Sequence, residues 1–184
     1  MTAGDTNPTN WSYGRCPLET APGSFGPFAG IVRTWRAKWP AGDALPARAA
    51  FDFPDFRGWW GRIAIARIRH DPFEVRFQLW GTQLAYWWGV DYTGRTLGEA
   101  SPDPAAWLNT EGRYFEAMAQ SPFIGVAWGG LEHYRRGGIR VMSVDLPLAE
   151  AGGVSHVLMA HREIGPGDAQ AAIMPELDLR DIRP

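Results

Sequence analysis

The sequence has 184 residues, of which 45% are hydrophobic and 21% are charged, and its formal net charge is −2 at pH 7. These values are ordinary for a globular protein and fit one domain with short extensions. The slight acidic excess argues against a dedicated nucleic-acid-binding protein, which normally carries a basic face. The ten tryptophans and nine phenylalanines predict a core that is rich in aromatic rings or built around an aromatic-lined cavity.

Cysteine content and hydropathy bear on the cellular compartment. Cys16 is the sole cysteine, so no disulfide can form within one chain, as is usual in the reducing cytoplasm. The first residues lack the basic and apolar regions of a signal peptide, and no run of about 18 apolar residues is present. We therefore expect a cytoplasmic protein with neither a secretory leader nor a membrane span.

The N-terminal part of the chain contains one predicted helix. Residues 1–27 are rich in Pro, Gly, Asn and Thr, which predicts a flexible lead. In the segment 28–44, apolar residues recur at steps of three and four from Phe28 to Trp39, which predicts a short amphipathic helix and then a linker. Such a helix must cover its apolar stripe. We expect it to contact an unidentified protein partner or to form a homodimer.

The rest of the chain predicts two strands, a run of helices and three more strands. The helical run extends from Gln83 to Trp88 and from Asp103 to Ala119. Long apolar stretches in the last three strands indicate that both sheet faces are covered. The predicted strands are Arg62–Arg69, Phe73–Trp80, Phe123–His133, Ile139–Leu148 and Val154–Ile164. Residues 45–164 are therefore predicted as one α+β domain, followed by a C-terminal tail at 165–184.

Two short motifs carry a resemblance to a known family. Residues 75–82 (VRFQLWGT) and 89–97 (GVDYTGRTL) resemble a bacterial family of small stand-alone PAS-like proteins, whose pattern is roughly RYRLVGT…G.DLTGR.L. Residues 45–48 (LPAR) and 146–149 (LPLA) are similar to two further elements of that family. The resemblance implies a PAS-like five-stranded antiparallel sheet with helices on one face and, in this chain, an added N-terminal helix. It also implies a sensory or regulatory role exerted through protein–protein contact.

The motif residues also have a direct physical interpretation. Asp91 and Thr93 can bond nearby backbone amides, Gly94 can adopt a positive φ, and Arg95 can tie the loop together. We therefore expect this motif to be scaffold. Trp80 departs from the family pattern, which has a smaller aliphatic residue there, and an inward-pointing tryptophan would shrink or fill the cavity.

A PAS-like geometry places a small apolar ligand between the sheet and the long helix. We expect Tyr114, Ser143 and His161 to supply the polar anchors of such a site. The alternative is a packed core without a ligand. The predicted lining residues are Phe77, Leu79, Thr82, Trp107, Tyr114, Trp128, Ser143 and His161.

The sequence shows no catalytic motif. The histidines at 70, 133, 156 and 161 have no metal-ligand spacing, and no Gly-x-Ser-x-Gly or phosphate-loop pattern occurs. We expect no catalytic residues, no metal and no cofactor. Two alternatives remain: a small-molecule-processing enzyme with His161 or His133 as its base, and a structural adaptor with a filled core.

Overall fold

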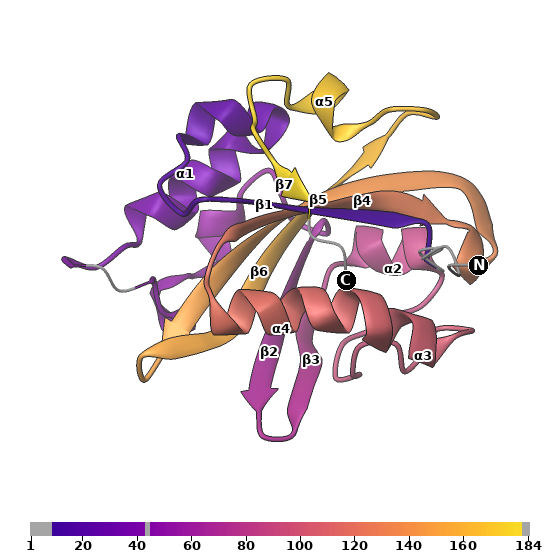
Figure 1. Ribbon diagram of the computed structural model, residues 1–184, viewed down its shortest axis with the longest axis horizontal. Coiled ribbons are helices and arrows are strands. Elements are labelled where there is room, and N and C mark those ends of the chain that lie inside the picture. The colour runs from indigo at the N-terminus through magenta and orange to yellow at the C-terminus, as the bar shows by residue number, and fades with distance from the viewer. Residues whose placement is uncertain (1–8, 43–44, 182–184) are drawn as a thin grey trace, which may run out of the picture.

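The computed structural model describes residues 9–42 and 45–181 and shows one antiparallel sheet of seven strands in the order β3-β2-β6-β5-β4-β1-β7 (Figure 1). Residues 1–8 of the predicted lead, 43–44 of the predicted linker and 182–184 of the predicted tail lie outside the described residues. The strands are β1 (Trp11–Cys16), β2 (Ile63–His70), β3 (Phe73–Trp80), β4 (Ile124–Leu131), β5 (Arg136–Glu150), β6 (Gly153–Ile164) and β7 (Arg180–Asp181).

Helices connect the strands and pack on the sheet. The α-helices are α1 (Ala29–Ala37), α2 (Thr82–Trp88), α3 (Pro104–Trp107), α4 (Arg113–Gln120) and α5 (Gln170–Ile173). Short 3₁₀ turns occur at Pro22–Phe28, Arg48–Ala50, Phe53–Phe56 and Glu132–Tyr134, and a π-helical turn spans Leu108–Gly112. None of the helices within 9–42 and 45–181 is long and apolar enough to cross a membrane.

The predicted fold class is wrong in two respects. All five predicted strands form, but β1 and β7 extend the sheet to seven strands. The helices also cover both faces of the sheet, since α1 lies on one side and α2, α3 and α4 lie on the other (Figure 1). The physical reason is that β4, β5 and β6 carry apolar side chains on both faces, as their long apolar runs indicated.

Helix α1 closes one face of the sheet. The helix forms where its periodicity predicts it, with Ile31, Val32 and Trp35 fully buried against the sheet. Trp35 Nε1 donates to the carbonyl of Pro147 on β5 at 3.0 Å. The apolar stripe that we expected to contact a second copy or a partner is thus covered by the same chain. The oligomeric state itself stays a prediction.

Strand β1 was not predicted, because its residues fall in the Pro- and Gly-rich lead. It pairs antiparallel with β4 from Trp11↔Gly129 to Cys16↔Ile124. Trp11 and Tyr13 point to the face that α2, α3 and α4 cover, whereas Cys16 joins the core on the α1 side. The lead therefore supplies core residues to both faces of the sheet.

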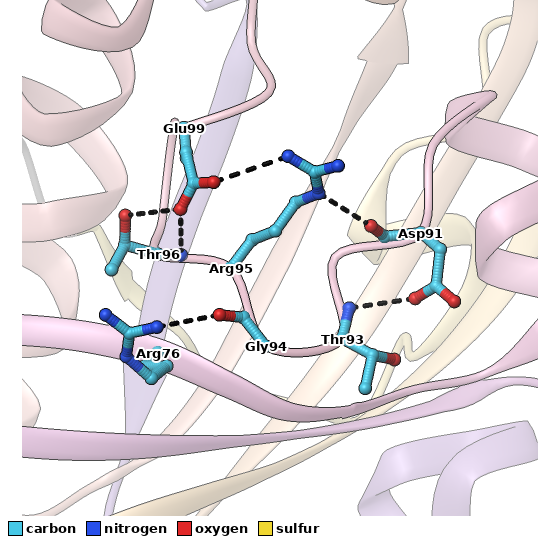
Figure 2. Close-up of polar contacts among 7 residues, drawn as sticks. All are labelled: Arg76, Asp91, Thr93, Gly94, Arg95, Thr96 and Glu99. Atoms are coloured by element: carbon cyan, nitrogen blue, oxygen red, sulfur yellow. Dashed lines mark hydrogen bonds and ion pairs between the residues drawn. The ribbon is translucent and has the colours of Figure 1, made fainter.

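The Asp91–Leu97 loop covers the free edge of β3. Phe77 N donates to Arg95 O at 2.9 Å, and Gly94 N donates to Phe77 O at 2.7 Å, so the loop continues the backbone pairing of the sheet. Figure 2 shows what holds the loop: Asp91 Oδ1 accepts from Thr93 N at 2.8 Å, and Arg95 Nε donates to the Asp91 carbonyl at 3.1 Å. The predicted scaffold role of this motif is confirmed, and a covered edge cannot template pairing with another chain.

Candidate functional site: an aromatic cavity beside the sheet

A small, partly open cavity lies between the sheet and helices α2 to α4. Its volume is about 20 Å³, which is room for one water molecule or a group of similar size. Drug-sized ligands occupy pockets of about 300 Å³ or more. Seven aromatic rings form most of the wall, namely those of Trp11, Phe77, Trp80, Trp88, Tyr92, Trp107 and Tyr134.

The rings brace one another at close range. Trp88 lies 5.2 Å from Trp80 and 6.2 Å from Trp11, measured between ring centroids, and Trp11 lies 5.9 Å from Trp107. These tilted and edge-on geometries are favourable for aromatic pairs. Tyr92 and Tyr134 also line the cavity, and their hydroxyls share a hydrogen bond of 2.7 Å. The wall is therefore a rigid set of rings, with few polar atoms turned inward.

One of those polar groups, Glu111, reaches the cavity from the π-helical turn. The long predicted helix is not continuous, because Leu108–Gly112 has π geometry between α3 and α4. Such turns are rare and are frequently found at functional sites. Burial raises the pKa of Glu111 to about 8, and the charge of Asp145 adds to this shift. Glu111 is thus protonated in neutral solution while the cavity holds no compensating charge.

A second buried carboxyl group, Asp145 on β5, anchors α4 to the sheet. Tyr114 Oη donates to Asp145 Oδ2 at 2.6 Å, and Asp145 Oδ1 has no hydrogen-bond partner in the described residues. Burial raises the pKa of Asp145 to about 6, while the Tyr114 bond opposes the shift. Ser143 also lowers this pKa, although its hydroxyl makes no hydrogen bond to Oδ1. Gly125 makes the contact possible, since a Cβ there would lie 1.7 Å from Tyr114 Oη.

Two further polar atoms at the cavity wall are unpartnered. His161 Nδ1 and Trp80 Nε1 are buried and make no hydrogen bond within the described residues. Burial lowers the pKa of His161 to about 4, against a small opposing effect of the Arg62 backbone, so the imidazole is neutral at pH 7. Buried polar atoms are nearly always paired in folded proteins. The cavity therefore offers donors and acceptors that nothing in the described chain satisfies.

The predicted site residues divide into two groups. Phe77, Trp107, Ser143 and His161 come together at the cavity wall. Tyr114 is buried on the same side of the sheet, where it binds Asp145. These five positions were found because strand alternation and helix periodicity give the correct face for each.

The other predicted site residues lie elsewhere. Leu79 is 37% exposed, Thr82 is exposed at the start of α2, and Trp128 packs on the α1 side of the sheet. Regular alternation places Leu79 on the same face as Phe77, but β3 has a bulge between these two residues, because they pair with the consecutive residues Ala66 and Ile65 of β2. Trp80 enters the cavity in its place, because a bulge rotates the following side chains to the other face.

Several residues of the site were missed. Trp11 lies in the segment predicted as a flexible lead, and Tyr134 lies just after the predicted strand Phe123–His133, in a 3₁₀ turn. Glu111 had a usable signal, because it lies four residues after Trp107 and four before Phe115, on the apolar side of the helix. Asp145 interrupts an otherwise apolar run, which indicates a buried position. Trp80 and Trp88 do point inward, and the cavity is small, as expected from their size.

Comparisons with known proteins add no relative: no family model, curated protein or solved structure matches this chain. Within the described ranges no group of three or more His, Cys, Asp or Glu side chains is arranged to hold a metal ion. The resemblance to PAS-like proteins thus stays a prediction.

Replacing Gly125 with alanine is expected to destabilise the protein by about 3 kcal/mol, through overpacking and loss of a buried hydrogen bond. The added methyl group would displace Tyr114 Oη and leave Asp145 without its partner. Gly137→Ala is the matched control, because a Cβ at Gly137 meets nothing within 4 Å. Denaturant unfolding measures both, and equal stability of the two variants would contradict this account of Tyr114.

Glu111 is also expected to make stability fall between pH 6.5 and 8. Its folded pKa is about 8, against an ordinary value of 4.5, so the folded state binds more protons and its stability is lost as pH rises toward 8. For one titrating group, the free energy of unfolding changes by at most about 1.4 kcal/mol per pH unit. Asp145 also makes the free energy of unfolding fall as pH rises, but only up to about pH 6. His161 makes the free energy of unfolding rise with pH between about pH 4 and pH 6.5.

Unfolding free energies at several pH values in this window test the assignment. Glu111→Gln should flatten the profile, whereas Glu116→Gln, at an exposed position on α4, should leave the wild-type slope unchanged. A Glu111→Gln profile as steep as that of the wild type would show that another group titrates there.

Proposed function

We propose that this chain is a cytoplasmic sensory or regulatory protein of the PAS-like type, which binds a small ligand in the aromatic cavity and signals through contact with another protein. The observation that supports the proposal most is the combination of a π-helical turn with unpartnered polar groups at a small cavity. A packed core without a ligand would gain stability by replacing these groups with apolar ones. A ligand that forms hydrogen bonds with these polar groups would account for their presence.

The size and lining of the cavity narrow the kind of ligand. We expected a small apolar molecule, but about 20 Å³ accommodates only a group near the size of water. Glu111, Ser143 and His161 also give the wall a polar component. The proposal is therefore for a small polar ligand, with the surrounding rings excluding water.

An enzymatic role receives less support from the same residues. A general base works best when its pKa lies near the working pH. Burial lowers the pKa of His161 to about 4, which makes it a weak proton acceptor at pH 7. His133 lies in the 3₁₀ turn after β4 and does not line the cavity. The structural-adaptor alternative is favoured by the close ring packing, and the ligand experiment below separates it from a sensor.

A sensor without an effector domain needs an exposed contact surface. Phe53 and Trp60 form such a surface: their rings stack at 4.9 Å with an interplanar angle of 3°, and they are 68% and 49% exposed. Trp60 Nε1 donates to the Phe53 carbonyl at 3.2 Å, which fixes the pair. Rigid exposed aromatic rings are typical of protein contact sites. We propose this aromatic pair as the contact surface, with a second copy of the chain as its partner, because α1 is already covered by the sheet.

Native mass spectrometry of the purified full chain tests ligand binding. The expected result is a mass above that of the polypeptide under native conditions, which falls to the polypeptide mass after unfolding. If the native and denatured masses agree even after incubation with a panel of small polar compounds, and the ammonium titration described below also shows no binding, the sensor proposal fails and the structural adaptor is favoured.

Changing the aromatic pair tests the contact. Phe53→Ser combined with Trp60→Ser should leave the fold intact, because both rings are largely exposed, and should weaken concentration-dependent self-association in sedimentation experiments at least tenfold. Tyr86→Ser is a matched control, since Tyr86 is 69% exposed on α2 and lies outside the pair. Unchanged association in the double variant would exclude this pair as the self-contact.

A further inference from the structure

The cavity wall carries a carboxyl group, that of Glu111, with no positive group of the described residues beside it. Glu111 makes no hydrogen bond or ion pair with any described residue, and no Lys or Arg within 9–42 and 45–181 lines the cavity. His161, a basic residue at the wall, is kept neutral by its burial. Any ligand that places a positive charge beside Glu111 would therefore fill an electrostatic gap.

The rings around Glu111 suit the same kind of charge. The face of a tryptophan ring attracts cations more strongly than that of tyrosine or phenylalanine, and the attraction grows when water is excluded. Trp11, Trp80, Trp88 and Trp107 all line the cavity. A carboxylate set among tryptophan rings combines two interactions that favour a cation over a neutral molecule of equal size.

The volume limits which cation can enter. A cavity of about 20 Å³ excludes choline-like or peptide ammonium groups with their attached chains. A metal cation would require several oxygen ligands, and the wall supplies few oxygen atoms among its rings. The ammonium ion is close to water in size and carries four N–H donors. Glu111, Ser143 and the free nitrogen of His161 are acceptors that match those donors.

We propose that the cavity binds the ammonium ion, with Glu111 as counter-ion and the tryptophan rings as a cation–π cage. This inference depends on the proposed function and names the ligand class of the same cavity. Binding then converts Glu111 from its protonated to its charged form. That change lies at the π-helical turn, where a helix can shift register, so the turn is the element through which binding reaches α3 and α4.

Binding should strengthen as pH rises toward 8, because a deprotonated Glu111 is required and its pKa in the empty cavity is about 8. The groups whose fields reach Glu111 come from several elements: Asp145 on β5, Tyr13 on β1, Tyr114 on α4, and Tyr92 and Tyr134 near the cavity mouth. The tyrosines stay protonated in this range, because burial raises the pKa of each. Asp145 is already charged above about pH 6.

The test is a titration of the full chain with ¹⁵N-labelled ammonium chloride against sodium chloride at equal ionic strength, followed by proton–nitrogen NMR and by tryptophan fluorescence. The expected result is a slowly exchanging signal of bound ammonium and a saturable fluorescence change that sodium does not produce. Glu111→Gln should weaken binding at least tenfold, whereas Glu116→Gln, exposed on α4, should bind as the wild type does. Trp80→Phe, which keeps a ring at the wall, should weaken it severalfold.

The possible outcomes separate the two proposals. The ammonium proposal is overturned if no saturable response appears, or if Glu111→Gln and the wild type titrate alike. If ammonium fails while native mass spectrometry finds another molecule bound, the sensor proposal stands and the ligand class is wrong. If neither experiment detects a ligand, both proposals fail together.

Discussion

Two carboxyl groups lie at the aromatic core, Asp145 fully buried and Glu111 half-buried at the cavity wall, and much of the local structure is organised around them. Asp145 is held by the hydroxyl of Tyr114, and that contact exists only because β4 has a glycine beneath the hydroxyl. Glu111 has no such partner and stays protonated instead. An unpaired buried charge is among the most destabilising features of a protein interior. One carboxyl group is thus satisfied by the fold, and the other remains available to a ligand.

The cavity is assembled from distant parts of the chain. Trp11 comes from β1 near the N-terminus, Glu111 from the π-helical turn and His161 from β6. Trp11 is fixed by a hydrogen bond from its Nε1 to the Gly130 carbonyl at 3.0 Å, and Gly129 leaves the space that its ring occupies. A change at the cavity therefore reaches the N-terminal strand, the long helix and the sheet together. This arrangement suits a protein that reports occupancy to a partner.

Sequence reasoning located the strands of the 45–164 region and the scaffold motif, because both depend on local periodicity and turn chemistry. It failed where long-range pairing decides the outcome. Strand β1 has few residues and Pro-rich flanks, so only its partner β4 defines it as a strand. Leu79 was placed in the site because alternation was extended through a bulge that the sequence does not mark. Glu111 was overlooked, although its spacing from Trp107 places it on the apolar side of the helix.

The close approach of the tryptophan rings has an optical consequence. Trp11, Trp80, Trp88 and Trp107 form a chain of contacts with centroid separations of 5.2–6.2 Å. At such distances excitation passes readily from one indole to the next, so light absorbed anywhere in the chain is emitted from whichever ring has the lowest excited state. The colour and polarisation of that emission depend on the surroundings of a single indole. The protein thereby carries an intrinsic fluorophore array centred on its own cavity.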